Sequence, residues 1–185
     1  MRFLNFHSYP LQSKMTPEIE EIFEKITERF QEPIQIGSRC QSCVFYRVED
    51  LSRKDLEVLA EFLSQRIINI CSPVYPKFLV ELQGSISGLA KVLADELRAF
   101  VPDIAVLPYE KIAAMNGHRS KTRDMNIVLV NDVITTARSC LEAHSSATMR
   151  DCSVLCWAAL IDRTFGPGPV PIAAALTGFP VELIE

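Results

Sequence analysis

The sequence predicts one α/β domain built around a parallel sheet. Short apolar runs, long enough for buried strands, alternate with longer segments in which apolar residues recur at helical spacing. Strands separated by helices favour a parallel sheet covered on both faces. A chain of 185 residues with 48% hydrophobic residues has the size and the apolar content of a single well-packed domain, spanning residues 1–185.

The N-terminal part predicts two amphipathic helices joined by extended chain. The first helix covers residues 16–30, with a threonine N-cap, a proline in the first turn and apolar residues at helical spacing. Residues 34–47 show period-two character, which indicates strands or an extended loop. Ser52 begins the second helix, with Asp55 in the capping-box position.

The rest of the chain supplies the alternation. Polar turns follow two of the apolar runs, and ligands of parallel sheets lie beyond the C-terminal ends of the strands. The expected strands are Phe78–Leu82, Ile104–Leu107, Ile127–Val130, Val154–Ile161 and a short Val181–Ile184, and the expected helices are Ser87–Phe100 and Ala137–Met149.

The stretch Met125–Ser139 has the pattern of a phosphate site. An apolar strand ends at Asn131-Asp132, and a hydroxyl-rich turn then leads into a helix. Unpaired N–H groups and the positive end of the helix dipole favour an anion there. Asp132 is placed to accept hydrogen bonds from sugar hydroxyls or to hold Mg²⁺ through water. The alternative is an ordinary strand-turn-helix unit in which Thr and Ser cap the helix.

This stretch resembles the phosphoribosyl-pyrophosphate (PRPP) motif of the type I phosphoribosyltransferases. Asn131 stands where the family has the first of two acids, and Ala137-Arg138 stand where it has glycine and a small residue. The resemblance implies that Asn131 and Asp132 hold the ribose, with Asp132 also the metal ligand and a catalytic residue. It implies a 5′-phosphate loop made of Thr135, Thr136, Ala137, Arg138 and Ser139.

A second turn, Gln83–Gly88, follows the first strand of the alternating part. Two glycines let the backbone approach a ligand closely, and a helix start again offers N–H donors. In the family the loop at this place binds pyrophosphate, so the resemblance assigns that role to Gly84 and Ser85.

Two further segments are similar to orotate phosphoribosyltransferase. Gly37–Tyr46 is similar to a segment that packs over the base, which implies an aromatic surface from Phe45 and Tyr46. Asp162-Arg163 is similar to a strand end whose arginine meets the orotate carboxylate, so Arg163 is the candidate for base recognition. The alternative is a surface salt bridge between Asp162 and a neighbour.

The family's basic catalytic segment is matched in one residue. Lys111 corresponds to that basic cluster and is the second catalytic candidate, and the connection to the next strand is short. A group of cations downstream is a possible substitute: His118, Arg119, Lys121 and Arg123.

Charge and cysteine content narrow the expected partners. A net charge of −4, with scattered Lys and Arg, gives no footprint for nucleic acid and favours a small anionic ligand. No apolar run has the length of a signal peptide core or a membrane span, so we expect a cytoplasmic protein with reduced cysteines. The spacing of Cys40 and Cys43 suits zinc, whereas Cys152 and Cys156 are typical of strand packing.

The expected function follows from the resemblance. The family fold is a parallel Rossmann-like sheet with a small hood, here built partly from residues 1–50. The implied activity is Mg²⁺-dependent transfer of phosphoribosyl between PRPP and a nitrogenous base, with orotate favoured, as in pyrimidine biosynthesis. The implied assembly is a homodimer. The alternative is a PRPP- or nucleotide-binding regulatory protein without effective catalysis.

Overall fold

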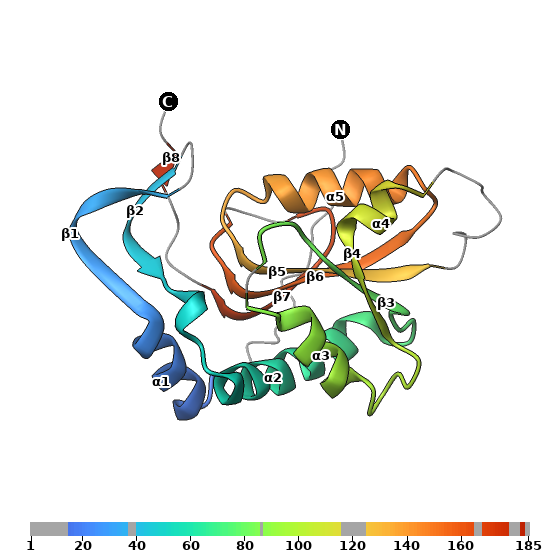
Figure 1. Cartoon of the computed structure of the whole chain (residues 1–185), viewed down its shortest axis with the longest axis horizontal. Coiled ribbons are helices and arrows are strands. Elements are labelled where there is room, and N and C mark those ends of the chain that lie inside the picture. Colours follow the sequence, from blue (N-terminus) through green and yellow to red (C-terminus); the bar gives the residue numbers. More distant parts are fainter. Residues whose placement is uncertain are drawn as a thin grey trace, which may run out of the picture.

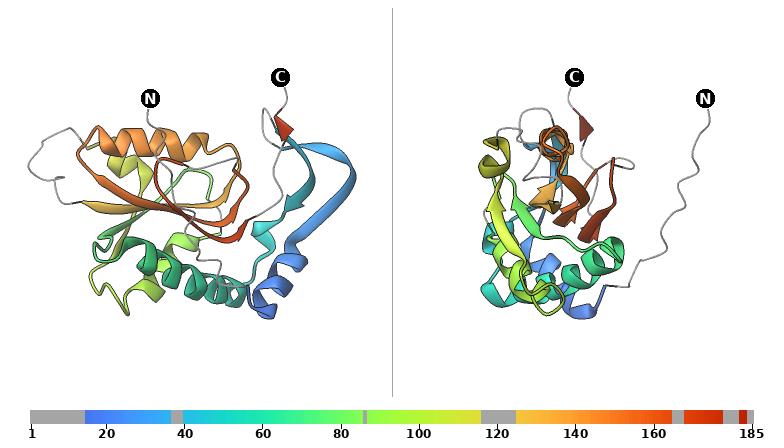
Figure 2. Two further views of the ribbon diagram at one scale, coloured as in Figure 1. Left: turned by 180° about the vertical axis from the view of Figure 1, so that it is seen from behind. Right: turned by 90° about the vertical axis from the view of Figure 1, so that its right-hand side faces the viewer.

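Two sheets organise the chain. A computed structural model describes residues 15–36, 40–85, 87–115, 125–164, 168–177 and 182–183. Within these ranges a five-stranded sheet has the order β4-β3-β5-β6-β7, and a three-stranded sheet has the order β1-β2-β8 (Figure 1). The smaller sheet lies beyond one end of the strands of the larger sheet (Figure 1 and Figure 2).

The larger sheet is parallel throughout, so the C-terminal ends of its strands share one edge. Glu81 pairs with Val130, and Ile134 pairs with Asp162. The turns that follow the three central strands therefore emerge side by side. The strands are β3 Phe78–Glu81, β4 Ala105–Pro108, β5 Asn126–Ile134, β6 Ser153–Asp162 and β7 Ile172–Thr177.

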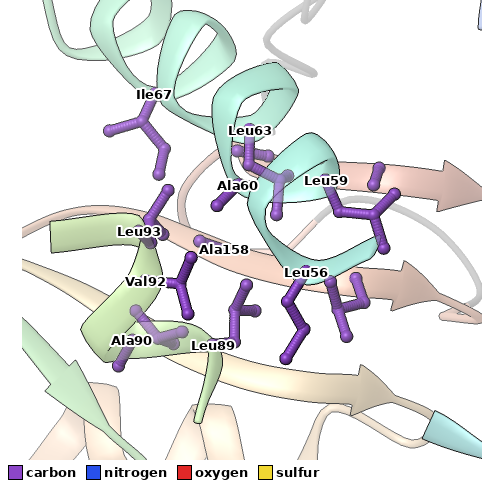
Figure 3. Packing of buried hydrophobic residues seen from close by; sticks show 14 of the residues in the cluster. Leu56, Leu59, Ala60, Leu63, Ile67, Leu89, Ala90, Val92, Leu93 and Ala158 are labelled. Atoms are coloured by element: carbon purple, nitrogen blue, oxygen red, sulfur yellow. The ribbon is translucent and has the colours of Figure 1, made fainter. Parts of the chain in front are cut away.

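Helices cover both faces of this sheet. Val128 and Val130 of β5 belong to the apolar cluster with α2 (Arg53–Cys71) and α3 (Leu89–Leu97), as Figure 3 shows for residues of these two helices. Alternate residues of β5 pack in a second cluster with α4 (Tyr109–Ala113) and α5 (Arg138–Thr148). None of the helices in the described ranges combines the length and apolarity needed to cross a membrane.

The three-stranded antiparallel sheet is called the hood below. It contains β1 (Thr27–Ile36) and β2 (Cys40–Tyr46), with β8 (Glu182–Leu183) from the other end of the chain beside β2. The helix α1 (Pro17–Ile26) precedes it, and a short 3₁₀ turn, η1 (Val48–Asp50), follows it. Most of the hood thus comes from the N-terminal segment.

The first predicted helix is wrong at its C-terminal end. It stops at Ile26, and the chain continues directly as β1, which contains Phe30. Thr27 has an extended backbone, with φ −88° and ψ 118°, and its hydroxyl donates to Phe23 O at 2.6 Å. Pairing of β1 with β2 therefore overrides the helical spacing of the apolar residues.

Three other elements differ from the expectation. The helix α4 and the strand β7 are not predicted from the sequence. The last predicted strand forms as β8, but it pairs in the hood and not in the parallel sheet. The sequence of β7, IAAALT, is rich in alanine, which carries little strand preference. Its place at the sheet edge comes from pairing with β6.

Candidate functional site

A cavity of about 230 Å³ opens between the parallel sheet and the hood. Its wall combines residues from the hood strands β1 and β2, from η1, from the last part of β5 and from the chain that follows β3, β5 and β6. Residues predicted separately for phosphate, sugar and base binding therefore meet in one place. The predicted residues that line it are Phe45, Tyr46, Gly84, Asn131, Asp132, Thr135 and Arg163, and the others are Ile36, Val48, Glu49 and Val133.

The turn after β3 presents its backbone to this cavity. Gly84 has φ +88°, a left-handed conformation that favours glycine, and a Cβ added there would meet no atom within 4 Å. A second left-handed glycine, Gly88 with φ +74°, precedes the first residue of α3. The turn thus combines a conformation that needs glycine with space for a ligand to approach the chain.

Asp132 holds this turn in place. Its side chain is 4% exposed, and Oδ1 accepts a hydrogen bond from Ser85 Oγ at 3.0 Å. Ser87 donates twice, from its backbone N–H to Oδ2 at 3.1 Å and from its hydroxyl to Oδ1. The carboxylate predicted to bind ribose therefore also links the ends of β5 and β3, while its ribose and metal contacts stay predictions.

Asn131 is turned toward the start of α5. Its Oδ1 accepts a hydrogen bond from the backbone N–H of Asp132 at 2.9 Å, and its side chain also hydrogen-bonds with Cys140. Burial raises the pKa of the Cys140 thiol to about 12. Asn131 thus stabilises the strand end while it contributes to the cavity wall.

The start of α5 has the geometry of an anion site with one irregularity. Ala137 precedes the helix with φ 58° and ψ 1°, and it provides no side-chain cap. Thr136 and Ser139 are exposed beside it. Arg138 points along the helix surface, where its Nε donates to Glu142 Oε1 at 2.8 Å. The predicted turn therefore leads into a helix, with a left-handed alanine where the family has glycine, and its phosphate contacts stay a prediction.

Replacing Ala137 with glycine is expected to stabilise the protein by up to about 1 kcal/mol. A left-handed backbone costs a non-glycine residue ~1–2 kcal/mol, and the added freedom of the unfolded glycine chain offsets part of that gain. Urea unfolding measures the difference. The control is Ser145→Gly in the middle of α5, which should lower the free energy of unfolding. An equal loss in Ala137→Gly would refute the claim that the backbone of Ala137 is strained.

Glu81 brings a second carboxylate to this edge of the sheet. Burial, and then the charge of Asp132, raise the pKa of Glu81, while a hydrogen bond with Ser85 acts in the opposite direction. The buried carboxylate of Asp132 and the half-buried carboxylate of Glu81 therefore favour a proton or a cation at this position.

The raised pKa of Glu81 predicts a pH-dependent stability. Glu81 binds a proton more readily in the folded protein than in the unfolded chain. The stability that this protonation contributes is therefore fully present below the pKa of Glu81 in the unfolded chain, and it is lost as the pH rises through the pKa of Glu81 in the folded protein. Glu81→Gln should therefore be more stable than the parent above this window and equal to it below. The measurement is urea unfolding of both proteins from roughly pH 4, near the ordinary pKa of a glutamate, to roughly pH 8. A difference that is constant with pH, or shared by exposed Glu61→Gln of α2, would contradict the expectation.

Arg163 forms the buried end of the predicted base subsite. Its side chain is 2% exposed, its Nη2 donates to Ser42 Oγ at 2.6 Å, and its Cζ lies 5.4 Å from the centre of the Tyr46 ring. Burial lowers the pKa of Arg163, and Tyr46 and Cys40 act in the opposite direction. The neighbouring Asp162 accepts hydrogen bonds from Thr164, and it forms no salt bridge with any residue that the structure describes.

Lys111 lies on α4 and is exposed. It does not line the cavity, but the residue before it, Glu110, accepts a hydrogen bond from Gln83 Nε2 at 2.6 Å. The lysine thus sits on a helix that touches the glycine-containing turn. The other predicted cations, His118, Arg119, Lys121 and Arg123, lie outside the described residues.

The cysteine pairs do not form a metal centre in the described part of the chain. Cys40 is buried and Cys43 is exposed, on opposite faces of β2, so they cannot share an ion. Cys152 and Cys156 are both buried, but Cys152 lies just before β6 and packs in the cluster with α5, whereas Cys156 lies within β6 and packs in the cluster with α2. Over the described ranges no three His, Cys, Asp or Glu side chains come together as a metal cage.

Four polar residues at or beside the site were not assigned from the sequence. Ser42 and Ser87 stand inside quoted segments but give no signal of their own, because serine is an ordinary loop residue. Glu81 ends a strand next to β5, and that position could have drawn attention to it. Glu49 lines the cavity three residues after Tyr46, but it belongs to no recognisable sequence motif.

Comparison with known proteins gives similarity in structure alone. The sequence matches no protein-family model and no curated protein. Orotate phosphoribosyltransferase from Aeropyrum pernix is 16% identical, with a TM-score of 0.60 over 85% of this chain and 93% of that chain. Adenine phosphoribosyltransferase from Trypanosoma brucei, in complex with AMP, pyrophosphate and ribose-5-phosphate, is 16% identical, with a TM-score of 0.61 over 89% and 81%.

A third structure has a different ligand. A hypothetical protein from Neisseria gonorrhoeae with bound ppGpp is 12% identical, with a TM-score of 0.52 over 69% of this chain and 81% of that chain. At such identities the likeness shows the fold, and the fold agrees with the one that the sequence motifs predict. The chain has the fold of the type I phosphoribosyltransferases.

Proposed function

We propose that the protein transfers a phosphoribosyl group between PRPP and a nitrogenous base, with orotate as the favoured base. One observation carries the proposal: each of the separate sequence motifs for sugar, phosphate, pyrophosphate and base contributes at least one residue to the wall of a single cavity, the phosphate loop through Thr135 and the pyrophosphate turn through Gly84. The fold supports it, because structures of orotate and adenine phosphoribosyltransferases share it.

The order of the subsites follows the strand ends. The 5′-phosphate would lie at the start of α5, against Thr135, Thr136 and Ser139, and the ribose would lie against Asn131 and Asp132. The pyrophosphate would lie along the turn with Gly84 and Ser85, next to Asp132. The base would lie under the hood, against the base-subsite residues Phe45, Tyr46 and Arg163.

The site residues perform three tasks in this reaction. Bond breaking leaves positive charge on the ribose and negative charge on pyrophosphate, so the positive end of the α3 dipole, next to the open turn at Gly84, would stabilise the departing group. Arg163 holds the base in line with the reacting carbon. The hood limits the access of water to the cationic sugar. Lys111, the second catalytic candidate, follows Glu110, the residue through which α4 contacts the turn.

Magnesium is part of the proposal. Bound Mg²⁺ neutralises charge on the leaving pyrophosphate. Asp132 already accepts three hydrogen bonds, and no metal cage occurs within the described ranges, so an all-protein site does not fit. An ion held mainly by substrate phosphates, with Glu81 and Asp132 as the neighbouring carboxylates, does fit the preference of Mg²⁺.

Isothermal titration of PRPP with Mg²⁺, followed by orotate and an assay for released pyrophosphate, tests the function. Binding with pyrophosphate release would support the enzyme, and adenine in place of orotate tests the choice of base. A protein that binds no PRPP would rule out the transferase, and one that binds neither PRPP nor a nucleotide such as ppGpp would rule out the alternative as well.

The second candidate is a protein that binds PRPP or a nucleotide without turnover. Its motivation is the start of α5, where left-handed Ala137 replaces glycine and Arg138 pairs with Glu142. The likeness to a protein with bound ppGpp adds a nucleotide ligand to this candidate. PRPP or ppGpp binding without pyrophosphate release, for every base tested, would favour it.

The resemblance also leads us to propose a homodimer in the cytoplasm. Light scattering after size-exclusion chromatography tests the assembly, and a mass equal to one chain of 20.8 kDa would refute it.

A further inference from the structure

Arg163 joins the two sheets of the molecule. Its backbone N–H donates to Ile134 O at 2.8 Å, at the end of β5, and its side chain reaches the hood. There the guanidinium contacts two residues of β2, through a hydrogen bond to Ser42 and the face of Tyr46. A change on β2 can therefore move a group of the base subsite.

Ser42 is itself fixed in place. It is 6% exposed, and its Oγ accepts both the N–H of Val44 at 3.1 Å and Nη2 of Arg163 at 2.6 Å. A hydroxyl oxygen has two acceptor positions, so both are used by these donors. The backbone of β2 thus determines where the oxygen that meets Arg163 lies.

The guanidinium is planar and carries its N–H donors in a fixed fork. One N–H bound to Ser42 and one face near Tyr46 together set the plane and its rotation. Arg163 also lines the cavity, whereas Ser42 does not. Ser42 therefore determines the direction from which Arg163 faces a ligand without touching that ligand.

We infer that Ser42 is a positioning residue for the base subsite. It holds Arg163 in the orientation in which the guanidinium meets an anionic group on the base, and this role rests on the proposed function. A base with a carboxylate, such as orotate, then binds more tightly because the two N–H donors are already oriented, whereas a neutral base gains less affinity from them.

The test compares Ser42→Ala with Ser42→Thr, which keeps the hydroxyl, and with Cys43→Ala, which changes the exposed neighbour on the same strand. The first readout is ¹⁵N-resolved NMR of the Arg163 guanidinium, assigned through Arg163→Met. We expect separate Nη signals, from hindered rotation, in the parent, Ser42→Thr and Cys43→Ala, and averaged signals in Ser42→Ala.

The second readout is steady-state kinetics. Ser42→Ala should raise KM for orotate about tenfold, the loss of one charge-assisted hydrogen bond, and leave KM for PRPP unchanged. Ser42→Thr should restore the parent value. Separate signals that persist in Ser42→Ala, or an unchanged KM for orotate with averaged signals, would overturn the inference.

The two readouts separate this role from the proposed function. A parent protein that releases no pyrophosphate overturns the function and with it the role in base binding. The NMR result is independent of turnover and would still show whether the Ser42 hydroxyl holds the guanidinium.

Discussion

Asp132→Ala is expected to remove measurable PRPP binding and to destabilise the fold by about 3 kcal/mol. The carboxylate accepts three hydrogen bonds from Ser85 and Ser87, and it is almost fully buried. Its loss leaves those donors unsatisfied at a cost of ~1–3 kcal/mol for each buried group, partly offset by rearrangement. The turn that carries Gly84 is then no longer fixed against β5.

Two further variants separate the charge of Asp132 from its hydrogen bonds. Asp132→Asn keeps one acceptor oxygen, so it should retain more stability than Asp132→Ala while it still binds PRPP at least tenfold more weakly. Asp103→Asn changes an exposed carboxylate in the turn before β4 and is the control. Urea unfolding and titration calorimetry are the measurements, and parent-like PRPP affinity in Asp132→Ala would refute the assigned site.

The meeting of the turns at one sheet edge could be predicted from the sequence. Parallel strands place their C-terminal ends together, so once β3 and β5 are neighbours, Gly84 and Asp132 must lie close. The apolar runs of β5 and β6 are long and distinct, and both strands form, although β5 continues past the expected end at Val130 to Ile134 and so includes Asn131 and Asp132. The motif order then located most of the cavity wall.

The elements that the sequence did not reveal depend on pairing between distant segments. The alanine-rich sequence of β7 gives only a weak strand signal, and its pairing with β6 makes it a strand. The end of α1 at Ile26 is likewise decided by the pairing of β1 with β2 across the hood. Local spacing cannot contain either fact, because the competing interaction lies elsewhere in the chain.

The contacts that orient the site residues were also beyond local pattern. Asp132 and Ser87 are 45 residues apart, and Arg163 and Ser42 are 121 residues apart. The motifs indicated which side chains carry the chemistry, and the fold determines their orientation. The same contacts predict which substitutions affect binding and which affect stability.

Arg163→Met is the second substitution with a large expected effect. It removes the guanidinium from the cavity wall and from Ser42, but keeps an apolar side chain of similar length in the buried position beneath Tyr46. KM for orotate should rise about 100-fold, because a charge-assisted pair with a carboxylate is lost in a water-poor site. KM for PRPP should remain near the parent value, since the phosphate and ribose subsites lie on other strand ends.

The choice of base distinguishes lost recognition from general damage. If Arg163 reads a carboxylate, Arg163→Met should reduce the preference for orotate over uracil, which lacks that group. Arg150→Met, by contrast, removes a guanidinium that donates to Ala113 O and Met115 O outside the cavity, so it should lower stability and leave this preference intact. Parent-like preference in Arg163→Met would mean that the arginine serves only to attach the hood. In that case hydrogen exchange of β2 would increase in this variant while base selection stayed the same. Loss of the hydrogen bond to Ser42 loosens the hood whichever role Arg163 has, whereas base selection changes only if Arg163 also contacts the carboxylate of the base.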